Sequence, residues 1–215
     1  MEKGTVNGLS RRGFLAGAAG GALAAGWMAR RAAAADGGMV RLGAPVPLEG
    51  EDPAAWAKAH RALGYRAAYC PDIPLKDTDR LRAVEKAFAA EDVVLAEVGR
   101  WCNLMDADPE ARKKNLERVT EGLALAEAVG ARCCVDIAGS FNKESWFGPH
   151  PDNLSPAFFD AAVENARKII DAVKPSRAKF AYEMMGWALP DSADSYLALI
   201  KAVDRPGFGV HLDPC

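Results

Sequence analysis

The sequence predicts a parallel α/β fold, built as a (β/α)8 TIM barrel that is incomplete within these 215 residues. Short apolar runs alternate with longer amphipathic segments from residue 39 onward, and such alternation with right-handed crossovers produces a parallel sheet. No Gly-x-Gly-x-x-Gly motif follows the first strand, so the dinucleotide-binding fingerprint of an open sheet is missing. Polar and aromatic residues gather just after the strands, where a barrel has its active-site mouth.

The first half of this domain is expected to hold three strands and two helices. Asp52 followed by Pro53 marks the start of a helix over residues 53–62, because aspartate caps helices and proline suits the first helical position. Apolar residues at helical spacing predict a second helix over residues 78–90. The strands are apolar runs at residues 39–44, 66–70 and 93–98.

The second half repeats the pattern. Asp108 and Pro109 start a long helix that Gly130 ends, and Ser155 and Pro156 start another that runs to residue 173. The remaining elements are strands at residues 131–138, 178–184 and 208–213 and a helix at residues 192–203. Together they make about five strand–helix units plus a sixth strand. Because a full barrel takes ~250 residues, we expect the other units beyond residue 215, so that residues 36–215 form the N-terminal part of the barrel domain.

The composition excludes several classes of protein. Hydrophobic residues make up 50% of the chain, and 27 Lys and Arg residues are balanced by 29 Asp and Glu residues. A nucleic-acid-binding protein concentrates basic residues on one surface, so we expect no nucleic-acid partner. The five cysteines form no Cys-x-x-Cys pair, which argues against a zinc ribbon or a disulfide scaffold. Cys133 and Cys134 are adjacent in an expected strand, so we expect their side chains to point to opposite faces and to be small core residues.

Residues 1–35 carry the three parts of an export signal. Arg11 and Arg12 are followed by Phe14 and Leu15, a weakly hydrophobic Ala/Gly-rich run and a small-residue cleavage site. This stretch resembles the twin-arginine signal, which implies a bacterial protein that the twin-arginine export machinery moves, already folded, to the periplasm. The apolar run is shorter than the ~20 residues of a spanning helix, so we expect cleavage after Ala35 and no stable membrane anchor.

Two consecutive strands end in a carboxylate. Glu183 closes the strand at residues 178–184, and Asp213 closes the next one. Adjacent parallel strands lie ~4.8 Å apart, and two carboxylates that close repel each other unless a proton or a metal ion lies between them. His211 precedes Asp213 by two residues, so it faces the same side of its strand. The pattern favours a divalent metal ion bound by Glu183 and Asp213, with His211 nearby.

Each of these residues also has a simpler interpretation. Glu183 could cap a neighbouring helix or pair with a nearby basic residue. Asp213 could be a helix N-cap, because Asp-Pro begins other helices of the chain. His211 could be a hydrogen-bonded core histidine. His150, in a Gly-Pro-His-Pro loop, is either a solvent-exposed residue or a contact for the substrate.

A family resemblance rests on two short motifs, Ala181-Tyr182-Glu183 and the Asp-Pro-Cys that follows Gly-Val-His-Leu. In these motifs and in strand order, residues 39–215 resemble the xylose isomerase-like barrel family of sugar and sugar phosphate isomerases and epimerases. The resemblance implies four ligands for Mn²⁺, Mg²⁺, Co²⁺ or Zn²⁺. Glu183 matches the glutamate of the fifth strand and Asp213 the aspartate of the sixth, whereas the histidine and glutamate of the last two strands would lie beyond Cys215.

The resemblance also implies a mechanism. Glu183 would serve as a metal ligand and as the catalytic base that removes the proton next to a sugar carbonyl group, giving an enediolate. Aromatic rings at the barrel mouth would stack on the apolar face of the sugar. The substrate contacts that we expect are the aromatic residues after the strands and two histidines: Trp101, Trp146, Phe147, Trp187, His150 and His211.

The sequence thus predicts a metal-dependent sugar isomerase or epimerase of the periplasm, whose partner is a small sugar. Two other functions stay open. One is a metal-dependent lyase or hydratase acting on an oxidised sugar, and the other is a carbohydrate-binding barrel that has lost catalysis. An endonuclease is not expected, because the balanced charge provides no DNA-binding surface. A homo-oligomer is one state that the sequence allows.

Overall fold

The computed structural model describes residues 40–213. The chain divides into two units, Met1–Arg41 and Leu42–Cys215, and the second contains every helix and strand named below. The expected twin-arginine signal at residues 1–35 lies outside the described residues. Within residues 40–213, no helix is both long and apolar enough to cross a membrane.

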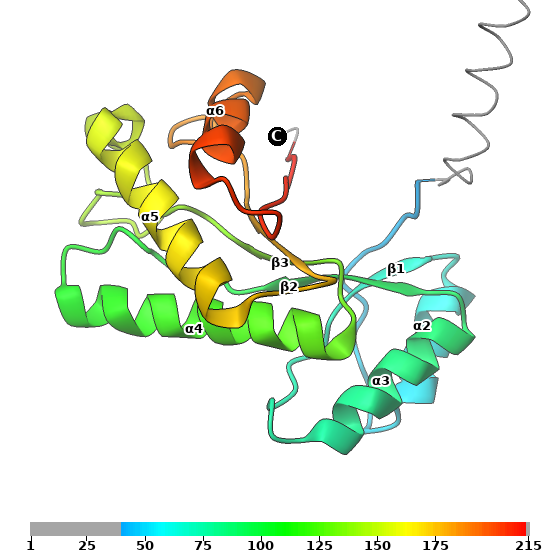
Figure 1. Ribbon diagram of the computed structural model, residues 1–215. Coiled ribbons are helices and arrows are strands. Elements are labelled where there is room, and N and C mark those ends of the chain that lie inside the picture. The colour runs from blue at the N-terminus through cyan, green and yellow to red at the C-terminus, as the bar shows by residue number, and fades with distance from the viewer. Residues whose placement is uncertain (1–39, 214–215) are drawn as a thin grey trace, which may run out of the picture. The chain divides into compact units, whose positions relative to one another are not determined.

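Four short strands form one parallel sheet. They are β1 (Ala67–Tyr69), β2 (Val94–Gly99), β3 (Cys133–Asp136) and β4 (Lys179–Tyr182), hydrogen-bonded to one another in the order of the sequence. Each strand is followed by a helix, as predicted, and Figure 1 shows α4 running along β2 and β3. A strand order without reversal is that of a barrel, because a doubly wound sheet changes direction at its switch point.

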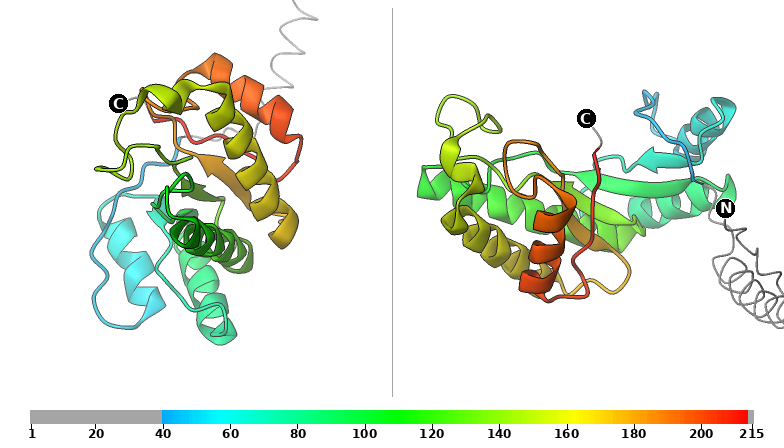
Figure 2. Two further views of the ribbon diagram at one scale, coloured as in Figure 1. Left: turned by 90° about the vertical axis from the view of Figure 1, so that its left-hand side faces the viewer. Right: turned by 90° about the horizontal axis from the view of Figure 1, so that it is seen from above.

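The described residues contain five α-helices, which are α2 (Pro53–Ala62), α3 (Thr78–Ala90), α4 (Pro109–Val129), α5 (Pro156–Val173) and α6 (Ala193–Val203). A short 3-10 helix, η1 (Pro151–Leu154), precedes α5. Each α-helix packs on the next one in the chain, so the helices form a curved row beside the sheet (Figure 2). This row is the outer layer expected of a barrel.

The helix boundaries follow from the caps that the sequence predicts. The side chains of Asp52, Asp108 and Ser155 each accept a hydrogen bond from a backbone N–H group of the first turn, and proline occupies the first position of each helix. Ser192 begins a capping box at the start of α6. Gly130 ends α4 in the left-handed conformation, with φ of 76°.

The first and sixth expected strands are reduced to isolated bridges. Gly43 pairs with Ala67 of β1, and at the other end only Phe208 and His211 of the segment 208–213 form such bridges. Both segments run parallel to their neighbours, as predicted. In the described part of the chain each has a strand on one side only, so few backbone hydrogen bonds hold it in regular strand geometry.

The two faces of the sheet carry different side chains. Tyr182 faces the helices, because its hydroxyl group donates a 2.9 Å hydrogen bond to the carbonyl oxygen of Ala162 in α5. Cys134 faces the same way and is fully buried in the core between sheet and helices. Side chains alternate along a strand, so Cys133 points to the opposite side, as predicted for adjacent strand residues, and there it is half-buried rather than part of the core between sheet and helices. We call the face turned away from the helices the inner face.

Candidate active site

Glu183 lies one residue past β4 and points to the inner face. Because Tyr182 faces the helices, the following side chain lies on the opposite side of the sheet. The backbone N–H group of Glu183 donates to the carbonyl oxygen of Asp136 at 2.9 Å, and Glu183 pairs with His211 in a parallel bridge. These contacts fix the Glu183 carboxylate at the carboxyl end of the strand, where the sequence predicts it.

Asp213 lies beside Glu183, and their side chains are hydrogen-bonded to each other. Burial raises the pKa of Glu183, and the hydrogen bond with Asp213 raises it further. Two carboxyl groups in this arrangement repel each other when both are ionised, and a proton or a cation between them relieves the repulsion. The structure therefore brings together the two acids that the sequence pairs, and their role as metal ligands stays a prediction.

His211 contacts a carboxylate that the sequence analysis missed. Its Nε2 atom lies 3.2 Å from Oε2 of Glu97 in β2, and Glu97 is only 9% exposed. The hydrogen bond with Glu97 raises the pKa of His211, against the opposing effect of burial. An acid inside an apolar strand is the same signal that marks Glu183, so the sequence does contain a clue to Glu97.

The contact between Glu97 and His211 shows that the inner face is concave. In the sheet, β3 and β4 separate β2 from the segment 208–213. In a flat sheet, segments three positions apart lie about 14 Å from each other, too far for two side chains that rise from the sheet to meet. The sheet therefore curves toward its inner face, as the wall of a barrel does.

Tyr69 of β1 lies near the same acidic side chains on the inner face. It pairs in register with Glu97, so both side chains lie on the inner face, and it is 44% exposed. Burial raises the pKa of Tyr69, and the nearby negative charges of Glu97, Glu183 and Asp213 add to this effect. We call these residues the inner-face cluster: Tyr69, Glu97, Glu183, His211 and Asp213.

The inner-face cluster offers part of a site for a divalent cation. Three carboxyl groups face one imidazole, so negative charge is in excess when the acids are ionised. The described residues contain no group of three or more His, Cys, Asp or Glu side chains that could hold a metal ion. They supply at most the pair of Glu183 and Asp213, to which further ligands must be added. Within these limits the pair fits a cation, because carboxylate oxygens suit divalent metals.

Trp101 lies against the inner face close to Glu97. Its φ of 34° is unusual for a residue other than glycine. The indole covers Gly99, where an added Cβ atom would collide with the indole nitrogen. Gly99 follows Glu97 by two residues, so the two share one face of β2. Glycine at this position therefore leaves room for the tryptophan ring on the inner face.

The other expected aromatic residues meet in the loops that follow β3 and β4. The indole N–H group of Trp187 donates to the carbonyl oxygen of Phe147 at 2.7 Å, and the rings of Trp146 and Phe147 have their centroids 5.1 Å apart. All three side chains are partly exposed. A cavity of about 530 Å³ between the loops after β2 and β3 has Trp146 in its wall. Such rings can stack on an apolar ligand face, and their contact with substrate stays a prediction.

Asn153 joins these two loops and was not singled out in the sequence. It is fully buried, and its side-chain oxygen accepts a 2.9 Å hydrogen bond from the backbone N–H group of Phe141. Its side-chain NH₂ group donates to the carbonyl oxygens of Gly148 at 3.2 Å and Trp187 at 3.4 Å. An asparagine in a loop ordinarily indicates a turn, so only the structure shows that this one connects two loops.

His150 has a local structural role. Its Nδ1 atom accepts a 3.2 Å hydrogen bond from the backbone N–H group of Asp152, which caps η1. This contact accounts for the position of the His150 side chain without any ligand. The role of His150 as a substrate contact stays a prediction.

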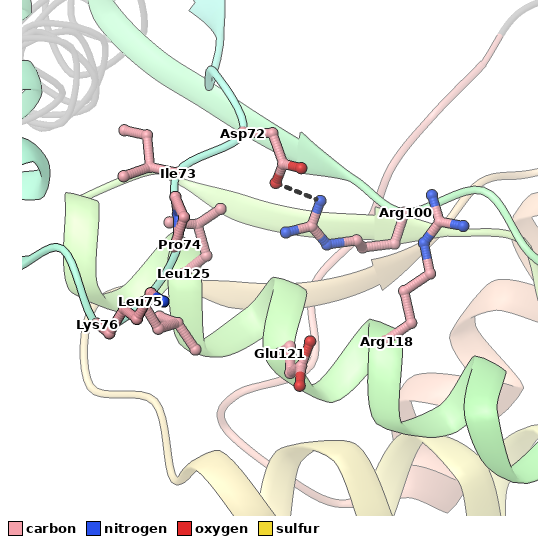
Figure 3. A pocket seen from close by; sticks show the side chains of 9 residues that line it. All are labelled: Asp72, Ile73, Pro74, Leu75, Lys76, Arg100, Arg118, Glu121 and Leu125. Atoms are coloured by element: carbon pink, nitrogen blue, oxygen red, sulfur yellow. Dashed lines mark hydrogen bonds and ion pairs between the residues drawn. The ribbon is translucent and has the colours of Figure 1, made fainter.

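A second cavity, of about 620 Å³, lies between α4 and the loop after β1 (Figure 3). Asp72 and Arg100 form a 3.2 Å ion pair at its edge, and Arg118 and Glu121 project into it from α4. Arg100 follows Gly99, so it points away from the inner face. No residue of the inner-face cluster lines this cavity, which is therefore separate from the candidate site.

Two comparisons of sequence give different results. The sequence model of a family described as "Xylose isomerase-like TIM barrel" matches residues 55–215. No curated protein matches the chain in sequence.

Solved structures of similar fold include two sugar epimerases and a nuclease. D-psicose 3-epimerase from Clostridium cellulolyticum, in a structure with D-tagatose, has a TM-score of 0.60 at 16% identity, over 81% of this chain and 63% of that one. L-ribulose 3-epimerase has a TM-score of 0.60 at 19% identity, over 81% and 61%. Endonuclease IV from Thermus thermophilus has a TM-score of 0.57 at 18% identity, over 81% and 63%. These likenesses confirm the fold class, and the chain spans less than two thirds of each of these proteins.

Proposed function

This chain belongs to the xylose isomerase-like TIM barrel family, and from this premise we propose that the whole protein is a divalent-metal-dependent sugar isomerase or epimerase that works through an enediolate. The observation that carries the proposal is the hydrogen-bonded pair of Glu183 and Asp213 on the inner face. The pair lies at the carboxyl ends of neighbouring parallel segments, where barrel enzymes have their catalytic groups. The two epimerases of similar fold support the reaction class by analogy.

Glu183 and Asp213 would hold Mn²⁺, Mg²⁺, Co²⁺ or Zn²⁺ together with ligands from outside the described residues. Their oxygen atoms are suitable ligands for these ions. When bound, the cation supplies a Lewis acid that polarises a sugar carbonyl group. The same charge allows both carboxylates to stay ionised side by side.

Residues of this chain carry out the proton transfer and the positioning of the sugar. Glu183 takes the proton from the carbon next to the carbonyl group, and the electron pair of the broken C–H bond forms the enediolate. In an isomerase the proton then returns to the neighbouring carbon, and in an epimerase an acid on the other face of the sugar delivers one. Trp101, Trp146 and Trp187 stack on the apolar face of the sugar and limit the access of water.

Proton exchange in D₂O tests this proposal. The whole protein is incubated with Mn²⁺ and D-fructose, D-tagatose or L-ribulose, and NMR detects deuterium at the carbon that loses its proton. We expect exchange with the wild-type protein and a loss of about 100-fold or more in Glu183→Gln. Glu164→Gln is the matched control, because Glu164 is an exposed acid of α5 that pairs with Lys168.

The outcomes separate the candidate functions. Absence of exchange with every sugar and metal tested would rule out an isomerase or epimerase of this kind. Release of a dehydrated product from an oxidised sugar would favour the lyase alternative. Sugar binding without exchange or elimination would favour the carbohydrate-binding barrel.

We also propose that the protein is exported to the periplasm by the twin-arginine route. The support is the sequence of residues 1–35, with Arg11 and Arg12 before the Ala/Gly-rich run. Replacing both arginines with lysine should keep the protein in the cytoplasmic fraction of a bacterial host. Equal periplasmic amounts of this variant and the wild-type protein would contradict the proposal.

A further inference from the structure

Within residues 40–213, no hydrogen bond satisfies two buried polar atoms of the pair of Glu97 and His211. Oε2 of Glu97 and Nε2 of His211 face each other at 3.2 Å. Oε1 of Glu97 and Nδ1 of His211 are buried and have no hydrogen-bond partner in the described part of the chain. A buried polar atom without a partner destabilises the fold, and in native proteins such atoms are rare and call for an explanation.

The chemistry of the two atoms limits what could bind them. Oε1 of a carboxylate only accepts hydrogen bonds, whereas Nδ1 donates or accepts according to the protonation of the ring. A hydroxyl group both donates and accepts, so it can satisfy either atom in each state. A metal cation bound at this place would contact the imidazole as well as the carboxylate. The described residues offer no set of three metal ligands here, so a cation is not the ligand that we infer.

Trp101 supplies an apolar surface next to this pair. Its indole covers Gly99, which lies on the same face of β2 as Glu97. Its left-handed backbone, with φ of 34°, is a strained conformation of the kind that gathers at binding sites. Polar atoms beside an aromatic ring suit a ligand that has hydroxyl groups on its edge and C–H groups on its face.

We propose that Glu97 and His211 form a hydroxyl-binding subsite on the inner face, which recognises a sugar hydroxyl group at a carbon other than the one that loses its proton. This inference rests on the proposed function, and it makes Glu97 a residue that determines specificity. The His211 side chain is 25% exposed and gives access to the pair. Binding then requires the Glu97 carboxylate or the His211 ring to turn slightly toward the ligand.

Sugars that lack one hydroxyl group test the subsite. Isothermal titration calorimetry measures the binding of D-fructose, D-tagatose and L-ribulose, and of their monodeoxy analogues, to the full chain with Mn²⁺ and with a chelator. The variants are Glu97→Met, which keeps the volume and removes both oxygens, and His211→Phe, which keeps a ring and removes both nitrogens. Glu121→Met on the exposed side of α4 is the matched control, and thermal melting checks that each variant folds.

The wild-type protein is expected to bind one of the deoxy analogues about tenfold more weakly than the parent sugar, since one hydrogen bond to a buried group is worth about 1.4 kcal/mol. In Glu97→Met and His211→Phe this difference disappears, and Glu97→Gln, which keeps one oxygen, retains part of it. If one variant fails to fold, the other still gives the comparison. If neither folds, the Gln variant must lose part of the discrimination for the proposal to stand.

Two results would overturn the subsite. Variants that keep the full discrimination, or that lose affinity for every sugar equally, would show that Glu97 and His211 only hold the fold together. In both cases the proposed function survives if the wild-type protein binds and exchanges a sugar. Failure of the wild-type protein to bind any of these sugars, with or without metal, would instead remove the proposed function and the subsite together.

Discussion

The carboxylate of Glu127 at the end of α4 accepts a 2.6 Å hydrogen bond from the hydroxyl group of Ser176, just before β4. It also accepts hydrogen bonds from the backbone N–H groups of Arg177 at 3.0 Å and Ala178 at 2.9 Å. Burial by itself raises the pKa of Glu127, but these hydrogen bonds lower it to about 2. One ionised side chain therefore joins the end of a helix to the start of the next strand.

We expect the hydrogen bonds between Glu127 and residues 176–178 to be lost at acid pH. Because the pKa of Glu127 is lower in the folded protein than its ordinary value of 4.5, the stabilisation is complete above about pH 5 and is lost as the pH falls toward 2. The carboxylate is partly exposed, so solvent screening reduces the effect to about 1 kcal/mol. In urea unfolding, Glu127→Gln should be less stable than the wild-type protein near pH 7, and the gap should narrow between about pH 5 and pH 2.

Glu121→Gln is the matched control for this prediction, because Glu121 is an exposed acid of the same helix. It should change the free energy of unfolding by less than about 0.5 kcal/mol at every pH. A gap between Glu127→Gln and the wild-type protein that does not change with pH would contradict the proposed linkage.

The helices could be predicted almost to the residue, because their boundaries depend on local chemistry. Asp108 caps α4 through the N–H group of Glu110, two residues away, and Gly130 ends the helix by its own backbone conformation. The outer strands could not be predicted as well. A strand needs a neighbour, and the regularity of the segment 208–213 depends on pairing that the sequence pattern does not reveal.

The sequence predicted only the part of the candidate site that depends on neighbouring positions in the chain, and not the contacts that depend on the fold. Glu183 and Asp213 end consecutive strands, so the sequence alone places them side by side. Glu97 meets His211 across 114 positions of the chain and across two intervening strands, and only the curvature of the sheet brings them together. Asn153 was missed because its partners in other loops are likewise fixed by the fold.

Asp136 should make stability depend on pH in the opposite sense from Glu127. It is fully buried, and burial raises its pKa to about 7, although hydrogen bonds from Cys102 oppose the rise. A folded-state pKa above the ordinary 3.8 gives stability that is complete below about pH 4 and is lost as the pH rises toward 7. Asp136→Asn carries no charge at this position, so its free energy of unfolding does not depend on this titration. Measured in urea, the free energy of unfolding of Asp136→Asn should rise by about 2 kcal/mol or more relative to that of the wild-type protein across this pH range, since one pKa unit corresponds to about 1.4 kcal/mol.

Asp136→Leu separates the charge from the hydrogen bond. The backbone N–H group of Cys102 donates to Oδ1 of Asp136 at 2.9 Å, and leucine removes this acceptor. We expect Asp136→Leu to be less stable than Asp136→Asn by about 1–3 kcal/mol at every pH. If the difference between Asp136→Asn and the wild-type protein stayed flat from about pH 4 to pH 7, the carboxyl group would not titrate as described.

Gly99→Ala should displace Trp101 from the inner face. The added Cβ atom would overlap the indole nitrogen, so the ring must move or the strand must shift, at a cost of about 1–3 kcal/mol. Acrylamide quenching should increase, because the displaced ring is more exposed than the 37% seen here. Gly186→Ala is the control, since a Cβ atom there meets nothing within 4 Å. Equal quenching and stability in the two variants would contradict the close contact between Gly99 and Trp101.

Asn153→Ala should release the loops after β3 and β4 from each other. The variant leaves the buried N–H group of Phe141 without its acceptor, which costs about 1–3 kcal/mol in thermal or urea unfolding, whereas the carbonyl oxygen of Gly148 keeps its hydrogen bond from the Ser140 hydroxyl group. Because Trp187 loses its contact with Asn153, its fluorescence should shift to longer wavelength as the ring becomes more exposed.

Asn165→Ala is the matched control, since the Asn165 side chain donates a 3.3 Å hydrogen bond to the carbonyl oxygen of Leu104 and its loss should cost less than about 1 kcal/mol. A stability loss in Asn153→Ala without any change at Trp187 would show that Asn153 supports only the loop after β3.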